Sequence, residues 1–180
     1  MLTDTQLAKI MPKLAAGKRK EYLPHLNAAM AEAKVDTPKR MAAFLAQLAH
    51  ESAQFRYMEE IASGAAYDKS VNPKLAAKLG NTQPGDGVRY KGRGPIQLTG
   101  RANYRACGDA LGVDLEDRPE LAATPEVGFR VAAWYWTSRK LNAKADAGDF
   151  DGITKSINGG FNGKADRDRY YALALKVLGE

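Results

Sequence analysis

Apolar residues recur at helical spacing along most of the chain. Between Met41 and Leu48 they stand at i, i+3, i+4 and i+7, which predicts a helix with one buried face. The same reasoning predicts helices over residues 3–17, 22–34, 37–51, 73–79, 101–111, 124–136, 149–157 and 165–178, with a short one after residue 117. No segment alternates like a long strand, and at most a short β-hairpin is expected between residues 61 and 97.

Cap residues support several of these helix starts. Thr3 and Gln6 match a capping box, and Thr37 stands before a proline that suits a first helical position. Gly17 is expected to end the first helix, and Pro24 is tolerable only in the first turn of the second. Because no repeat or linker interrupts the pattern, we predict a single, mainly α domain over residues 1–180.

One carboxylate falls on a predicted buried face. Glu51 follows Phe44 by seven residues and therefore shares its face of the helix, while Glu60 comes nine residues later in a less regular stretch. A carboxyl sheltered from water holds its proton more tightly, as a general acid must, and a second carboxylate completes the pair used by glycosidases. As a structural alternative, Glu51 is a buried glutamate that pairs with an arginine, and Glu59 and Glu60 lie on a solvated face. Periodicity alone favours this structural alternative.

Composition narrows the classes of function. Hydrophobic residues make up 44% and charged residues 27% of the chain, as in soluble globular proteins. The single cysteine, Cys107, excludes an internal disulfide and stands at helical spacing between Tyr104 and Leu111, as a core residue would. We find no signal peptide and no apolar run that could span a membrane, so stable membrane insertion is not expected.

The charge balance favours anionic partners. The net charge of +6 suits a polyanion such as nucleic acid, anionic lipid or an acidic cell wall. The basic residues are dispersed apart from Lys18–Lys20, and no nucleic-acid motif is present, so nucleic acid is not expected as a partner. Two histidines and one cysteine lack metal-ligand spacing, and neither a metal nor another cofactor is predicted.

Five short motifs carry a family resemblance. They are His50-Glu51-Ser52, Glu60-Ile61, the run from Gly92 to Thr99 (Gly-Arg-Gly-Pro-Ile-Gln-Leu-Thr), Ile157-Asn158-Gly159-Gly160 and Ala165-Asp166-Arg167. Their order resembles glycoside hydrolase family 19, which includes plant chitinases and phage endolysins. The resemblance covers about residues 38–180 and leaves the helices of residues 1–37 outside it. It implies a two-lobed, lysozyme-like fold with a central cleft.

Within that family the chain looks most like phage endolysins that degrade peptidoglycan. It lacks the longer insertion between the two glutamates and the disulfides of plant chitinases. Thr99 stands where those chitinases usually have serine, and Asn162 stands where they have an acidic residue. These departures leave the implied reaction unchanged but put chitin as the substrate in doubt.

The resemblance also implies catalytic roles. Glu51 corresponds to the general acid, Glu60 to the base that activates water, and Thr99 to the hydroxyl that holds this water. As an alternative, Thr99 is the N-cap of the helix that starts at Arg101. Because Glu51 is expected to be buried and ionisable, its replacement by glutamine should leave stability unchanged or raise it.

The implied substrate-binding residues have structural alternatives as well. Asn103 could be a solvated helix residue, Asn158 a helix C-cap and His50 a packed core histidine. Arg167 resembles a family arginine near the catalytic glutamates and would explain how a buried Glu51 is tolerated. The full implied set is His50, Tyr90, Gln97, Asn103, Asn158 and Arg167.

The expected function is that of an endolysin. It would hydrolyse β-1,4 bonds of bacterial peptidoglycan as an N-acetylmuramidase, inverting the anomeric centre, and so lyse the host cell. The alternatives are a chitinase and a catalytically silent wall-binding module. The resemblance further implies a monomer made in the host cytoplasm that acts on glycan strands in the periplasm after a holin permeabilises the membrane.

Overall fold

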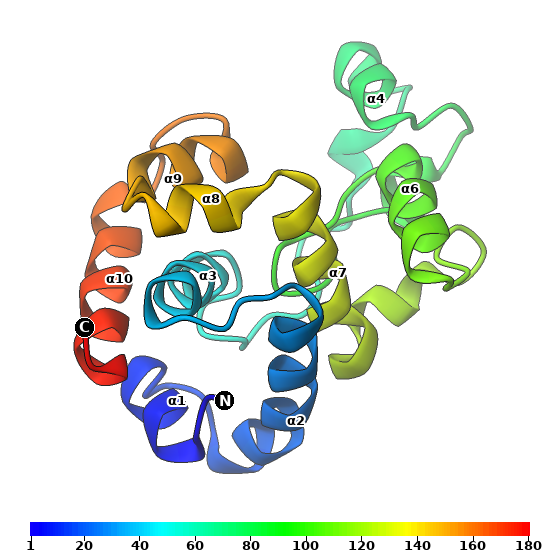
Figure 1. Cartoon of the computed structure of the whole chain (residues 1–180). Coiled ribbons are helices and arrows are strands. Elements are labelled where there is room, and N and C mark those ends of the chain that lie inside the picture. Colours follow the sequence, from blue (N-terminus) through cyan, green and yellow to red (C-terminus); the bar gives the residue numbers. More distant parts are fainter.

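The computed structural model describes residues 1–180, which form helices and connecting loops (Figure 1). Isolated bridges join Glu59 to Arg93 and Arg93 to Leu98 where a hairpin was expected. No helix has both the length and the apolar composition needed to cross a membrane. The elements are α1 (Asp4–Ile10), α2 (Ala16–Glu32), α3 (Pro38–Glu51), the 3₁₀ segment η1 (Ala65–Tyr67), α4 (Pro73–Leu79), α5 (Asp86–Arg89), α6 (Arg101–Leu111), η2 (Pro119–Ala123), α7 (Pro125–Ser138), α8 (Leu141–Asp146), α9 (Phe150–Asn158) and α10 (Lys164–Leu178).

The predicted helix starts are largely confirmed. The side chains of Thr3 and Thr37 accept hydrogen bonds from backbone N–H groups in the first turns of α1 and α3. The expected boundary between the first two helices is wrong. Gly17 lies in the first turn of α2, where a Cβ added to it would meet no atom within 4 Å, and α1 already ends at Ile10. Pro24 therefore stands inside α2, which loses one backbone hydrogen bond there.

The larger lobe surrounds α3. Every residue from Met41 to Ala49 is buried, so this helix is enclosed on all sides rather than on one face. Helices α8, α9 and α10 pack directly against it, and α1, α2 and α7 complete the lobe (Figure 1). Because Glu51 ends such a helix, its position is determined by the packing of the whole lobe.

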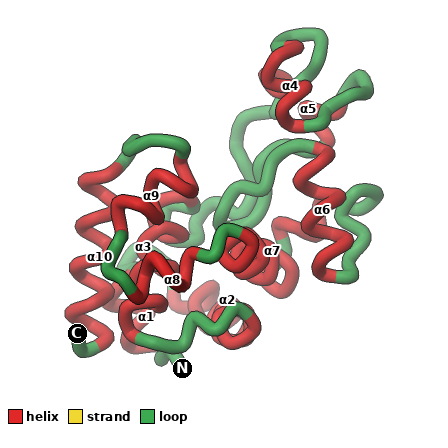
Figure 2. The backbone as a smooth tube through the Cα atoms, turned by 45° about the horizontal axis from the view of Figure 1, so that its top comes forward, coloured by secondary structure: helices red, strands yellow, loops and turns green.

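The smaller lobe consists of η1, α4, α5 and α6. In Figure 2, α4 and α5 lie far from the larger lobe, whereas α6 packs against α7. An ion pair between two side chains of the smaller lobe helps to hold its loops in place. Asp86, only 2% exposed, accepts hydrogen bonds from both Arg101 Nε (2.8 Å) and Nη2 (2.6 Å). Burial opposes ionisation of Asp86, but Arg101 and two backbone N–H groups hold the pKa of its carboxyl below the ordinary value. This lobe supports the segment that carries Glu60.

A left-handed turn leads away from Glu51. Ala53, Gln54 and Phe55 have φ values of 49°, 63° and 60°, which are unfavourable for residues with a Cβ. Buried contacts compensate for this conformation. Phe55 packs edge-on against Phe129 with ring centroids 5.1 Å apart, and Gln54 Nε2 donates to Tyr170 Oη at 2.7 Å. The mainly helical, two-lobed fold predicted from the sequence is confirmed.

Candidate active site

The first carboxylate of the site meets a buried arginine. Glu51 is the last residue of α3, and its side chain is 21% exposed. Arg167, which is 1% exposed on α10, donates from Nη2 to Glu51 Oε1 at 2.6 Å. The structure thus places Arg167 beside Glu51, as the family resemblance implied. Glu51 is both partly accessible to solvent and held by a cation.

Arg167 has two further partners. Its Nη1 donates to Gln47 Oε1, and its Nε donates to the backbone oxygen of Asn162 at 3.2 Å. Asn162 therefore contacts the guanidinium through its main chain, at the position where plant chitinases have an acidic side chain. Gln47 was not among the residues singled out from the sequence. Its place one helical turn before Glu51 was the available signal.

His50 connects the end of α3 to the start of α10. Its Nδ1 lies 2.8 Å from Asp166 Oδ2, and a Cβ on Gly163 would lie only 2.2 Å from its Cε1. Burial opposes ionisation of Asp166, but Arg169 and His50 keep the pKa of this carboxyl below the ordinary value. His50 is therefore a half-buried, hydrogen-bonded residue next to Glu51 rather than a packed core histidine.

The second carboxylate lies on an extended segment that precedes the smaller lobe. Tyr67 Oη donates to Glu60 Oε1 at 2.9 Å, and the Gly92 N–H donates to Oε2 at 3.0 Å. Burial and the neighbouring carboxylate raise the pKa of Tyr67 to about 12, so its hydroxyl remains a proton donor at neutral pH. The adjacent Glu59 instead pairs with Lys91 and Arg93. Tyr67 is a site residue that the sequence reasoning missed.

The glycine-rich motif brings an amide toward Glu60. Gln97 adopts a left-handed conformation with φ 59°, and its Nε2 donates to Gly94 O at 2.9 Å. A Cβ on Gly92 would lie 2.7 Å from Gln97 Oε1 and 3.2 Å from Glu60 Oε2. Only glycine leaves room here for both side chains, so the motif places the Gln97 amide and the Glu60 carboxylate side by side.

Thr99 does not cap the following helix. Its Oγ1 donates to Gln97 O at 3.0 Å, and the N-cap of α6 is Gly100, which has no side chain. The hydroxyl keeps its lone pairs for another donor, such as water. Asn103 is exposed and donates from Nδ2 to Thr99 O at 2.8 Å. Both residues are accessible enough to contact a ligand.

Two implied binding residues have structural roles. Tyr90 is 1% exposed, its ring is tilted against that of Tyr104 with centroids 5.3 Å apart, and its Oη donates to Glu116 O at 2.9 Å. The ring is enclosed in this structure, and the substrate-binding role expected for Tyr90 stays a prediction. Asn158 is half-buried, and its Oδ1 accepts from the Asn162 N–H at 3.1 Å. Gly159, with φ 78°, takes the helix C-cap that was the alternative for Asn158.

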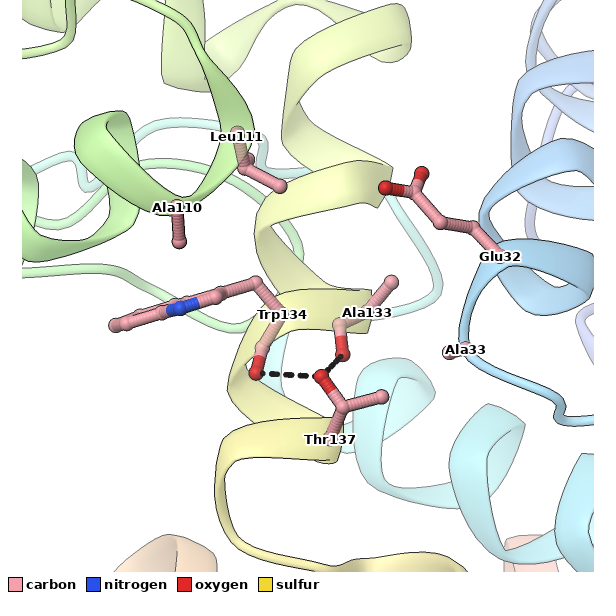
Figure 3. A pocket seen from close by; sticks show the side chains of 7 residues that line it. All are labelled: Glu32, Ala33, Ala110, Leu111, Ala133, Trp134 and Thr137. Carbon is pink, nitrogen blue, oxygen red and sulfur yellow. Dashed lines mark hydrogen bonds between the residues drawn. The ribbon is translucent and has the colours of Figure 1, made fainter.

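A surface hollow of about 210 Å³ lies between α2, α6 and α7 and contains none of the candidate residues (Figure 3). Trp134 and Leu111 line it, and the Thr137 hydroxyl donates to backbone oxygens of α7. Its one carboxylate, Glu32, pairs with Arg130 at 3.1 Å. The hollow therefore lacks the two carboxylates that acid/base chemistry needs.

The predicted residues form two groups, one on each lobe. The larger lobe carries His50, Glu51, Asn158 and Arg167, whereas the smaller lobe and the segment before it carry Glu60, Gln97, Thr99 and Asn103. Each group contains one carboxylate, and the two carboxylates have different partners. A pair of carboxylates in unlike environments is typical of glycosidases.

Comparison with known proteins supports this class. The sequence pattern described as "Chitinase class I" of glycoside hydrolase family 19 matches residues 23–150, and the chain belongs to this family. A "Glycosyl hydrolase family 19 domain-containing protein" of Haemophilus influenzae is 29% identical over 196 residues, covering 95% of this chain and 94% of that protein. "Endochitinase At2g43620" of Arabidopsis thaliana is 40% identical over 150 residues, covering 78% of this chain and 48% of that protein. The chain thus spans about half the length of this plant relative.

Solved structures match over nearly the whole chain. Chitinase C from Streptomyces griseus HUT6037 has a TM-score of 0.77 at 28% identity, covering 98% of this chain and 92% of that structure. The class IV chitinase of family 19 from Zea mays has a TM-score of 0.71 at 26% identity, covering 98% and 92%. Residues beyond 150, which include Asn158 and Arg167, thus lie within the shared fold although the family pattern ends before them.

Proposed function

We propose that the chain hydrolyses β-1,4 bonds between N-acetylated hexosamines, with Glu51 as the general acid and Glu60 as the general base. The observation that carries this proposal is the unlike setting of the two carboxylates. Glu51 is held by the buried Arg167, whereas Glu60 is held by a tyrosine hydroxyl and a backbone N–H. Different partners allow two carboxyl groups to hold different protonation states in one site.

The contacts suggest how each group would act. Arg167 contacts Oε1 of Glu51, which leaves Oε2 to carry the proton for the leaving glycosidic oxygen. Tyr67 and Gly92 occupy one lone pair on each oxygen of Glu60 and fix its orientation, and the remaining lone pairs can accept a proton from water. Thr99 would hold that water together with Glu60. Attack by water rather than by a carboxylate inverts the anomeric centre.

As the polymer, we propose bacterial peptidoglycan. The net charge of +6 favours an anionic wall over neutral chitin. The match to a bacterial relative over nearly the full length of both chains also fits an enzyme that acts on a bacterial wall. In this proposal the chain is a monomeric endolysin of the N-acetylmuramidase type. It would be made in the host cytoplasm and reach the wall after a holin permeabilises the membrane.

Chitin is a second candidate substrate, and a specific observation favours it. The plant relatives are named endochitinases, and the matching solved structures are chitinases from Streptomyces and maize. The same two carboxylates would serve on chitin, because both polymers present β-1,4 bonds flanked by N-acetyl groups. The choice of polymer depends on subsites that recognise the lactyl and peptide groups found only in peptidoglycan.

Product analysis tests the reaction and the polymer together. Purified peptidoglycan and chitin oligomers are incubated separately with the protein, and the released sugar ends are identified by mass spectrometry. Reducing N-acetylmuramic acid ends would establish the muramidase, and N-acetylglucosamine oligomers released only from chitin would establish the chitinase. Release of neither product by the folded protein would refute the catalytic proposal and leave the wall-binding alternative.

Stereochemistry tests the assigned roles. Proton NMR of a short glycan, recorded within minutes of mixing and before mutarotation, should show α product from the β-linked substrate. An initial β product would indicate a retaining mechanism. A 1,6-anhydro end would indicate a lytic transglycosylase, in which Glu60 would not have the role of base assigned here.

A further inference from the structure

A buried polar chain continues behind Arg167, away from Glu51. Gln47 is completely buried on α3, one turn before Glu51. Its Oε1 accepts from Arg167 Nη1, and its Nε2 donates to Thr154 Oγ1 at 2.9 Å. Thr154 is also completely buried and lies on α9. The chain Thr154–Gln47–Arg167–Glu51 thus links three helices of the larger lobe through side chains alone.

Three contacts determine how the guanidinium lies. Arg167 donates to Gln47, to Glu51 and to the backbone oxygen of Asn162. Because a guanidinium is a rigid plane, three acceptors around it fix both its position and its tilt. Glu51 is the only carboxylate within ion-pair distance of Arg167. The tilt therefore decides which oxygen of Glu51 is held and which remains available.

Arg167 selects the orientation of the Gln47 amide, and Thr154 holds the other end of the amide. If the amide were flipped, its NH₂ group would face the N–H of Arg167, donor against donor, whereas the Thr154 hydroxyl could pair with either end. In the observed orientation both ends of the amide have partners, and no buried side-chain polar atom in the protein lacks one. Satisfied buried networks of this kind hold groups rigidly, because any other arrangement leaves a polar atom unpaired.

We infer that Gln47 is a positioning residue for the proposed acid and that Thr154 holds Gln47 in place. Neither side chain is exposed, so neither touches the substrate, and their effect reaches the reaction through Arg167. The inference rests on the proposed role of Glu51 as general acid. It adds that α9, which contributes none of the catalytic groups, controls the geometry of the acid.

The first test compares Thr154→Val with Thr154→Ser. Valine has nearly the shape of threonine but cannot accept the hydrogen bond, whereas serine retains the hydroxyl. On an oligomer that the wild type cleaves, Thr154→Val should lower kcat about threefold to tenfold, which corresponds to one ordinary hydrogen bond, with KM unchanged. Thr154→Ser should retain the kcat of the wild type. A folded Thr154→Val variant with the kcat of the wild type would overturn the inference.

The second test is a pH profile. Gln47→Glu keeps the size of the side chain and adds a carboxylate against Arg167, so the guanidinium favours the ionised acid less strongly. The alkaline limb of the kcat profile should then move to higher pH, by about one unit. The other titratable groups near Glu51 are His50 on α3, Asp166 on α10 and Tyr135 on α7, with Arg139 against the tyrosine ring, and the variant changes none of them.

Gln54→Glu is the matched control for the added charge. Gln54 is 4% exposed and binds the Lys13 N–H and the Tyr170 hydroxyl, so the variant adds a buried carboxylate without contacting Arg167. The alkaline limb of the kcat profile should move in Gln54→Glu by no more than about a third of the shift expected for Gln47→Glu. Equal shifts in both variants, or none in Gln47→Glu, would overturn the inference.

Glu51→Gln separates this inference from the proposed function. An active, folded Glu51→Gln variant would refute the proposed acid and the positioning role together. An inactive Glu51→Gln variant, with Thr154→Val and Gln47→Glu both indistinguishable from the wild type, would refute the positioning role alone.

Discussion

Replacement of Glu51 by glutamine should remove activity and also lower stability. The change keeps the shape of the side chain but removes the dissociable proton and the negative charge. Loss of a general acid lowers the rate by about 10²–10⁴-fold. Because Arg167 is 1% exposed and Glu51 is its only carboxylate partner, the variant leaves a buried cation with neutral acceptors only.

The loss of stability can be sized from this one contact. The 2.6 Å bond from Arg167 Nη2 to Glu51 Oε1 joins two ions, and hydrogen bonds to charged groups contribute about 1.5–3 kcal/mol. The glutamine oxygen still accepts from the charged guanidinium, so only part of this contribution, about 1–1.5 kcal/mol, is the expected loss. For a chain of this size it lowers Tm by about 2–6 °C.

Two measurements on one preparation check both parts. The initial rate of substrate cleavage reports the acid, and calorimetric unfolding reports the ion pair. Glu59→Gln is the control, because this carboxylate is 45% exposed, lies next to Glu60 and pairs with Lys91 and Arg93. It should change stability by less than about 1 kcal/mol and retain activity. A folded Glu51→Gln variant with more than about a tenth of the wild-type rate would refute the assignment, and a raised Tm would refute the reasoning about Arg167.

Three further outcomes are expected. Thr99→Val should lower turnover at least about tenfold while stability falls by about 0.5–1.5 kcal/mol, and equal activity per folded molecule would show that the hydroxyl only braces its loop. Gly159 has φ 78° and free space around an added Cβ, so Gly159→Ala should lower the free energy of unfolding by about 1–2 kcal/mol. Gly163→Ala should lower it more and also reduce activity, because the added Cβ would lie 2.2 Å from the ring of His50. Equal losses of stability for the two variants in chemical unfolding would contradict the predicted clash. Hydrogen bonds from Arg105 and, to a lesser extent, Arg101 lower the pKa of the Glu116 carboxyl to about 2. The contribution of Glu116 to stability is therefore present above the ordinary pKa of 4.5 and is lost as the pH falls toward 2. Glu116→Gln should reduce Tm more at about pH 6 than at about pH 2, and an equal reduction would refute this linkage.

Local sequence signals predicted most of the helices, although not α5 or α8. Capping by Thr3 and Thr37 was readable because a cap depends on residues within one turn. The boundary near Gly17 was not, since a glycine with free space around it can begin a helix as well as end one. Burial on every side of α3 was also invisible to periodicity, because neighbouring helices decide how many faces are covered.

The composition of the site was only partly readable. Glu51, Glu60 and Arg167 were predicted from motifs, but the partners Tyr67 and Gln47 were not, because hydrogen bonds between distant segments leave no local pattern. Tyr90 shows the reverse case, because this residue just before the Gly92–Thr99 motif turns inward and its hydroxyl donates to Glu116 O.

Only the tertiary structure decided what each carboxylate meets. From the sequence, Glu51 was a buried ionisable group whose removal should leave stability unchanged or raise it. In the fold, α10 places Arg167 against it, and the expected sign of the change reverses. Sequence spacing determines which residues share a helix face, whereas the free energy of a charge depends on the atoms that surround it, and these come from helices more than a hundred residues apart.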